Sequence, residues 1–172
     1  DGSVARLDTG TKISIDAAIF DPKTKTLVVK VQLLIGRVWS KIFSLATPES
    51  TWEVKTSNAV ATVRGTSFGM VYNPKNKQSR VVVGEHKVGL GLLNDKGTVI
   101  RKDIVVIEER KTIVVTDELV RQVVENKKSV DQLVMIQGVE DAPRDVGIWV
   151  EESLRKDEET RIEQEGLSRN SN

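Results

Sequence analysis

The chain has 172 residues, with 26 Lys and Arg against 25 Asp and Glu, no Cys and one His. This length fits one domain, or one domain with an appendage. The lack of Cys excludes disulfides, thiolate zinc sites and Cys nucleophiles, and a single His leaves little for metal or acid–base clusters. A net charge of +1 also argues against a dedicated nucleic-acid binder. We therefore expect a non-catalytic protein without a metal, a cofactor or a nucleic-acid partner.

The charge is divided unevenly along the chain. Residues 1–100 carry 14 Lys and Arg and 8 Asp and Glu, a net +6, whereas residues 101–172 carry 12 and 17, a net −5. Such opposite halves would allow copies of the chain to stack head to tail. No apolar run approaches the roughly 18 residues of a membrane span. Because the sequence begins at Asp1 rather than Met, we expect any signal peptide or membrane anchor to lie upstream of it.

Alternating apolar and polar residues dominate from residue 4 to residue 115, and β-branched residues are abundant there. A period of two is typical of half-buried strands. The clearest strand is 27–35, and its apolar face would consist of Leu27, Val29, Val31, Leu33 and Ile35. Further strands are predicted at 52–56, 59–64, 68–72, 80–83, 88–93, 104–107 and 112–115. Short strands separated by Gly, Pro, Asn and Asp turns predict an all-β solenoid, barrel or sandwich.

The pattern changes after residue 115, where Thr116 can cap a short helix. The apolar residues that recur there at helical spacing are Leu119, Val120, Val123 and Val124. We therefore assign residues 1–115 to a β domain and residues 116–143 to a connecting segment that contains this helix.

A second helix is predicted from about residue 144 to residue 165, with Pro143 in its first turn. With the tail it forms the third segment, 144–172. Its apolar stripe consists of Val146, Trp149, Val150 and Leu154. The stripe either docks on the β domain through Trp149 or packs on a neighbouring subunit or another protein. The later part of the helix is highly charged and should be solvated, and residues 167–172 should be disordered.

Three motifs suggest enzymatic sites. Gly65-Thr66-Ser67-Phe68-Gly69 matches the Gly-x-Ser-x-Gly pattern of a hydrolase nucleophile, but that motif needs a strand that turns into a helix, and 68–72 continues as a strand. His86 lies in a polar step between two predicted strands, so we interpret it as an exposed turn residue. Gly89-Leu90-Gly91 lacks the strand–loop–helix context of a phosphate loop. We expect no catalysis at any of them.

Two further sites would serve other ligands. A basic patch towards anionic polymers or lipids could form from Lys23, Lys25, Lys30, Arg37 and Lys41, although solvated strand faces are the commoner outcome. An envelope polysaccharide could stack on Trp39, Trp52 or Tyr72. The pattern places both Trp residues on core faces, so neither site is favoured.

The most specific segment of the sequence is 47–68, which ends in Val63-Arg64-Gly65-Thr66 followed by Phe68. It resembles the hallmark of the FecR-like domain family, a strand of small and β-branched residues that ends in Val-Arg-Gly-Thr-x-Phe. Gly36-Arg37-Val38-Trp39 is similar to the Gly-x-Val/Leu-Trp step of that family, and 2–7 with 10–11 is similar to its first repeat. The resemblance covers about residues 2–115.

A physical role for the hallmark follows from its residue types. Gly65 allows a backbone conformation or a close approach that other residues cannot adopt. Arg64 offers five donors that can gather loop carbonyls or bind a carboxylate, and Thr66 can add a local hydroxyl bond. We interpret Val63, Arg64, Gly65, Thr66 and Phe68 mainly as a turn lock, with an Arg64 that reads a ligand as the alternative.

The resemblance implies an extracytoplasmic all-β domain without enzymatic activity. The best-known members of the family span the membrane and relay the signal of an outer-membrane receptor to a cytoplasmic sigma factor. Our leading hypothesis is a protein-interaction module of the cell envelope or surface that binds a protein partner or copies of itself. The alternatives are a self-assembling subunit of a surface layer or filament, and a fragment of a regulator of the anti-sigma type.

Overall fold

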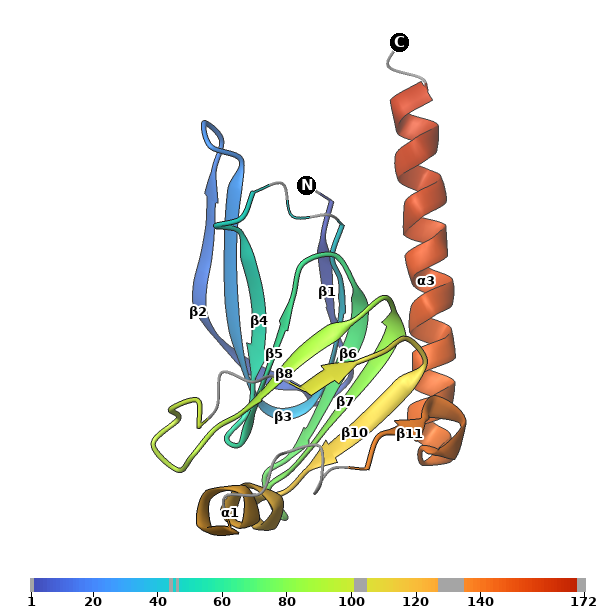
Figure 1. Ribbon diagram of the computed structural model, residues 1–172. Helices are drawn as coiled ribbons and strands as arrows, with labels where there is room; N and C mark the ends of the chain where they lie inside the picture. The colour runs from blue at the N-terminus through green and yellow to red at the C-terminus, as the bar shows by residue number, and fades with distance from the viewer. Residues whose placement is uncertain (1, 44, 46, 101–104, 127–134, 170–172) are drawn as a thin grey trace.

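The computed structural model describes residues 2–43, 45, 47–100, 105–126 and 135–169 (Figure 1). Its first ten strands are β1 (Val4–Leu7), β2 (Lys12–Asp21), β3 (Thr26–Lys41), β4 (Thr51–Lys55), β5 (Ala59–Val63), β6 (Ser67–Asn73), β7 (Gln78–Glu85), β8 (Val88–Leu92), β9 (Val105–Ile107) and β10 (Lys111–Val115). They are followed by α1 (Asp117–Asn126), β11 (Gln137–Gly138), a 3-10 turn (Val139–Asp141) and α3 (Arg144–Arg169). The predicted fold class, all-β with a C-terminal helix, is confirmed. The strand predicted at 104–107 is β9, with residue 104 outside the described residues.

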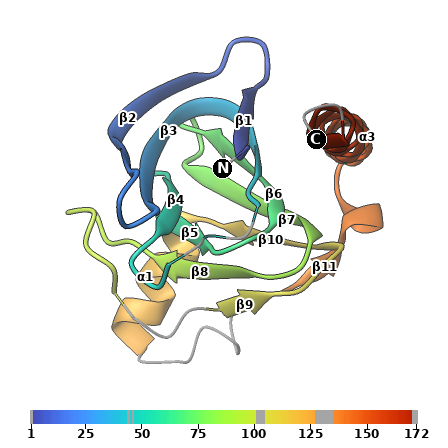
Figure 2. The same cartoon turned by 90° about the horizontal axis from the view of Figure 1, so that it is seen from above.

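One eleven-stranded sheet contains all of these strands, and β3 organises it. The first half of β3 pairs antiparallel with β2 and parallel with β4, and its second half pairs antiparallel with β1 and β6. One wing continues from β6 through β7 and β10 to β11, and the other from β4 through β5 and β8 to β9. Figures 1 and 2 show the two wings curling towards each other. The sequence left solenoid and sandwich open, and the structure is a single curled sheet.

The main core fills the inside of this curl, where Phe68 and Met70 of β6 are fully buried. The core face predicted for β4 and β5 is confirmed, because alternate residues of the two strands are buried: Trp52, Val54, Ala59, Ala61 and Val63. Cross-strand pairing of β4 with β5 places these side chains on one side of the sheet.

The apolar face predicted for β3 is only partly correct. Of that face, Leu33 belongs to the core, Leu27 and Val29 pack against it, and Val31 is buried. Ile35 is exposed instead. The pairing with β2 shifts by one residue between Leu33 and Ile35, so the in-and-out alternation reverses there. Gly36 then adopts a φ of 101°, and a Cβ at this position would collide with Oγ1 of Thr11.

The short helix α1 packs at one end of the curl (Figure 1). The Thr116 side chain accepts a hydrogen bond of 3.2 Å from the backbone N–H of Leu119, which confirms the predicted cap. Val120 and Val123 are buried in the main core, whereas Val124, predicted on the same stripe, is exposed. Nearby in sequence, β11 pairs with β10, so the connecting segment contributes to the sheet.

The long helix α3 begins after Pro143 as predicted, but it continues to Arg169 rather than ending near Glu165. Residues 167–169, which were predicted to be disordered, are therefore helical, and 170–172 lie outside the described residues. Arg161 bridges Glu158 and Glu165 at one-turn spacing, which favours helix in this solvated half. Of the helices in the described ranges, none is long and apolar enough to cross a membrane.

Candidate functional site

The outer face of the sheet carries a second, smaller core beneath α3. Along β7, Val81 and Val83 belong to the main core, while Val82 between them belongs to the cluster under the helix. Val82 packs there with Trp39 of β3. The helix contributes Val146, Trp149, Val150 and Leu154. The predicted stripe therefore docks on the chain's own sheet, and the alternative of a stripe free to pack on another subunit is not what the structure shows.

Two glycines of the sheet make room for this helix. A Cβ at Gly69 of β6 would lie 2.5 Å from Cη2 of Trp149 and 2.9 Å from Cε3 of Trp39. A Cβ at Gly84 of β7 would lie 2.8 Å from Cδ2 of Leu154. The two indoles meet edge to face, with ring centroids 5.6 Å apart and an interplanar angle of 88°. At this helix–sheet distance, a Cβ at either position would force a neighbouring side chain to move.

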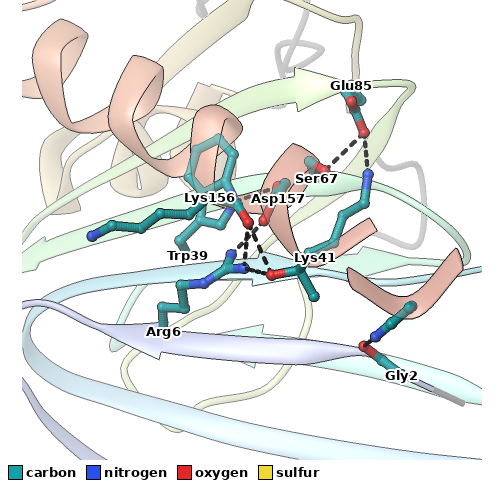
Figure 3. A network of polar contacts seen from close by, with 10 residues as sticks. Gly2, Arg6, Trp39, Lys41, Ser67, Glu85, Lys156 and Asp157 are labelled. Carbon is teal, nitrogen blue, oxygen red and sulfur yellow. Dashed lines mark hydrogen bonds and ion pairs between the residues drawn. The ribbon is translucent and has the colours of Figure 1, made fainter. Parts of the chain in front are cut away.

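A buried polar network lies next to this apolar contact (Figure 3). Asp157 of α3 is 2% exposed, and its carboxylate forms an ion pair with Arg6 of β1. The other carboxylate oxygen accepts a hydrogen bond of 2.9 Å from Nε1 of Trp39. Arg6 also donates to the Thr160 hydroxyl at 2.9 Å and to the Lys156 carbonyl at 3.2 Å. The network links the first strand of the chain to its last helix.

A second ion pair holds the start of α3. Arg37 of β3 binds Asp145, and its guanidinium carbon lies 5.8 Å from the ring centroid of Trp149. The hydrogen bond from Arg37 holds the pKa of Asp145 below its ordinary value. Asp145 lies in the first turn of α3, where a carboxylate is also favoured by the helix dipole. A third pair joins Arg110 to Glu151.

Glu85, at the end of β7, forms a further polar cluster (Figure 3). It accepts hydrogen bonds from Lys41 and Ser67. The Ser67 hydroxyl is fully buried and donates to Glu85 at 2.9 Å. Partial burial would raise the pKa of Glu85, but the hydrogen bonds from Lys41 and Ser67 outweigh it and lower that pKa. The carboxylate is therefore ionised at neutral pH.

A pH dependence follows from this lowered pKa. A carboxylate whose pKa is depressed on folding adds stability above its unfolded-state pKa of about 4.3 and loses that stability as the pH falls through the lower folded value. We expect Glu85→Gln to lower the urea midpoint at pH 7, and the difference from wild type to shrink as the pH falls below about 4. Glu163→Gln, at an exposed position of α3, should leave the midpoint unchanged at both pH values. A Glu85→Gln difference that is the same at both pH values would contradict the assignment.

Residues 64–66 of the hallmark segment form the short turn between β5 and β6. Arg64 donates to the carbonyl oxygens of Thr47 at 2.7 Å and Pro48 at 3.1 Å. Gly65 has a φ of 148°, a value that favours glycine. The Thr66 hydroxyl donates to the Lys87 carbonyl at 3.0 Å. These contacts tie the turn to two neighbouring loops, and Val63 and Phe68 on either side of it are buried. The role of a turn lock stays a prediction.

The other sequence motifs do not assemble into sites. Within the described residues, Ser67 donates to Glu85 and not to His86, which occupies a turn with a φ of 59°. Both glycines of 89–91 lie within β8. No group of three or more His, Asp or Glu side chains in the described ranges could hold a metal.

The residues predicted for the two ligand surfaces are mostly buried or ion-paired. The three aromatic residues that could have stacked on a polysaccharide are buried: Trp39, Trp52 and Tyr72. In the predicted basic patch, Lys30, Arg37 and Lys41 form ion pairs with Glu53, Asp145 and Glu85. Lys23 and Lys25 lie at the exposed turn between β2 and β3. Three of the five cations are therefore paired with carboxylates, which argues against a basic ligand surface.

The sequence patterns assigned no role in helix docking to four residues that take part in it: Arg6, Gly69, Gly84 and Asp157. Gly69 stands inside the predicted strand 68–72, where glycine often marks a close approach, so a signal was present for it. Gly84 follows the predicted strand 80–83, so the same signal was absent there. Asp157 gives no such signal, because it stands among other charged residues of a solvated helix half.

Comparison with known families identifies the fold. Residues 1–89 match the model of the family described as FecR protein, which is more than half of the chain. The chain belongs to the FecR protein family. The match contains the hallmark segment and the strands β1–β7, and ends in β8.

Solved structures show the same fold. Two crystal structures of a candidate anti-sigma factor from Parabacteroides distasonis, at 1.65 Å and 2.50 Å resolution, superpose with TM-scores of 0.53 and 0.51. Each is 16% identical in sequence, and each alignment covers 80% of this chain and 52% of the other. The FecR chain thus aligns with about half the length of these neighbours. No curated protein sequence matched it.

Proposed function

We propose that this FecR chain is a non-catalytic, extracytoplasmic protein-interaction module in a signal relay of the anti-sigma type. The observation that carries the proposal is the FecR match over residues 1–89. The fold it shares with a candidate anti-sigma factor supports the same class of role. The chain has no Cys and one His, which is consistent with a protein that binds rather than catalyses.

The docked helix suggests how such a module passes on a signal. A relay needs two states of one element, and a partner must bind one of them more tightly than the other. The first half of α3 is held by the sheet, while its second half extends past the N-terminal strand with charged, solvated side chains (Figure 1). The ion pair of Asp157 with Arg6 lies where the two halves meet, so a partner bound to the solvated half would act on the sheet through it.

Transcript profiling in the source organism tests the relay. Deleting the gene should change the expression of a small set of promoters that share one sigma factor, and the wild-type gene should restore it. A gene carrying Gly69→Val, which forces α3 from the sheet, should fail to restore it, whereas Gly147→Ala should succeed. A deletion that alters the shape or integrity of the envelope without a promoter-specific change would overturn the relay and favour the structural-subunit alternative.

The location needs its own measurement. An epitope fused to residue 172 should become accessible to protease once the outer layers of the cell are opened, while the cytoplasm stays sealed. Protection of the epitope until the cells are lysed would contradict an extracytoplasmic module.

A further inference from the structure

The strand β2 offers a long, open sheet edge. On one side it pairs with β3, and no other described strand pairs with its second side. Figures 1 and 2 show β2 at the rim of the sheet, on the side away from α3. An unpaired row of backbone N–H and C=O groups is a template for pairing with another strand.

The open edge is also apolar. Ile15 is 63% exposed, Ile19 61% and Phe20 51%. Single exposed apolar residues are common on protein surfaces, but three on one open edge strand of ten residues favour an interface.

A β-bulge at Asp16 sets which side chains share a face of β2. The register with β3 shifts between Ile15 and Ala17. Four residues of β2 pair with core-facing residues of β3 and share their face: Ile13, Ile15, Ala18 and Phe20. Ser14, Ala17 and Ile19 pair with residues on the outer face and lie on that face. Asp16 reaches across β3 to pair with Lys55 of β4, which places it on the outer side too.

This sequence is self-complementary about a two-fold axis between Asp16 and Ala17. Antiparallel pairing of two copies places Lys12 opposite Asp21 of the partner subunit, and Ile13 opposite Phe20 of the partner subunit. It also places Ser14 opposite Ile19 of the partner subunit, and Ile15 opposite Ala18 of the partner subunit. Charge meets opposite charge at both ends, and every pair from Ile13 to Phe20 joins side chains of the same face.

Neighbouring registers lose this match. A shift of one residue brings opposite faces together in every pair except a central one, in which Asp16 meets Asp16 of the partner subunit or Ala17 meets Ala17 of the partner subunit. A shift of two residues pairs Ile15 with Asp16 of the partner subunit, or Asp16 with Ile19 of the partner subunit, and leaves Lys12 without its acidic partner. The self-complementary register is therefore the one that a second copy would adopt.

We propose that two copies of this chain associate through their β2 strands, in the antiparallel register centred between Asp16 and Ala17, to form a closed dimer with one continuous sheet. The association does not depend on the proposed relay. A single strand pair buries less surface than a standard interface, so we expect a dissociation constant of about micromolar size. It also consumes the open edge of both copies, so it ends at two and does not lead to a filament.

Molar mass in solution tests the association. Light scattering of the 172-residue chain should show a dimer that dissociates on dilution. Ile15→Lys places a charge opposite Ala18 of the partner subunit and should raise the dissociation constant by about tenfold or more, because the contact occurs twice. Ile148→Lys, at another exposed isoleucine, on α3, should leave it unchanged. A wild-type monomer at every concentration would overturn the proposal, as would a dimer that Ile148→Lys disrupts and Ile15→Lys does not.

Cysteine cross-linking tests the register, and the cysteine-free chain makes it direct. A mixture of Ser14→Cys and Ile19→Cys chains should form the mixed disulfide several times faster than either chain forms its own. A mixture of Ser14→Cys and Ala17→Cys chains should show no such preference. Equal rates in all mixtures would exclude this pairing. Co-sedimentation of a monomeric chain with anionic phospholipid vesicles would also overturn it, by assigning the same apolar strand to a lipid surface.

Discussion

Gly69→Ala will destabilise the FecR chain by about 2–3 kcal/mol, the usual cost of forcing atoms into a packed core. The added Cβ would lie 2.5 Å from Trp149 and 2.9 Å from Trp39, so one indole has to move. Moving Trp149 weakens the docking of α3 on the sheet, because Trp149 is one of the four helix residues of the small core. Urea unfolding followed by far-ultraviolet circular dichroism measures the loss, and a larger Gly69→Val substitution should increase it.

Gly147→Ala is the matched control for this prediction. Gly147 lies in α3, and a Cβ there has no atom within 4 Å. The same change should therefore stabilise the chain by about 0.5–1 kcal/mol through helix propensity alone. Equal stability of Gly69→Ala and wild type would show that the helix does not pack as described.

Arg6→Met will destabilise the chain by about 3 kcal/mol, because it leaves the carboxylate of Asp157 buried without its cation. Asp157 is 2% exposed, and among the described residues its carboxylate would keep the hydrogen bond from Trp39 alone in this variant. Thermal unfolding should show a lower midpoint at neutral pH. The loss comes from the orphaned charge rather than from the missing attraction, which distinguishes it from the loss of a surface pair.

The double variant Arg6→Met with Asp157→Asn separates these two causes. The introduced carboxamide has no charge but retains an oxygen that can accept the hydrogen bond from Trp39. More than half of the stability lost in Arg6→Met should therefore return. Arg161→Met, which removes an exposed cation of the same helix, should change the midpoint little. A double variant less stable than Arg6→Met alone would contradict a buried-charge effect.

Gly69→Ala and Arg6→Met both test the contact between α3 and the sheet. The first changes its apolar packing, and the second removes its buried ion pair. If α3 is the element that relays a signal, variants that weaken docking should both lower stability and alter the response of target promoters. A variant that lowers stability in another part of the sheet should lower stability alone. The comparison therefore distinguishes a functional helix contact from a merely structural one.

The charge asymmetry of the sequence has a different meaning in the structure from the one expected. The net charge of +6 on residues 1–100 (the basic front) and of −5 on residues 101–172 (the acidic back) suggested that copies of the chain attract one another. Within the folded chain, Arg6 and Arg37 of the front pair with Asp157 and Asp145 of the back, and Lys77 pairs with Asp117. Part of the asymmetry is thus neutralised inside one molecule, which weakens the argument for head-to-tail stacking.

Local patterns in the sequence were sufficient to predict most strands, the cap at Thr116 and the FecR family. These features depend on neighbouring residues, because the two-residue period of a strand, a helix cap and a glycine turn each act over a few positions. Even the stripe with Trp149 could be identified in this way, since helical spacing places its members on one face.

What that stripe touches depends on the tertiary fold. Arg6 and Asp157 are separated by 151 positions, and Gly69 meets Trp149 although the two are also far apart in the chain. No local pattern specifies such a pair, because the choice depends on the curl of the sheet and on which of its faces remains uncovered. The shifts along β2 and β3 were hidden for the same reason: a bulge depends on two strands together, and it reverses the faces that each strand's own alternation predicts.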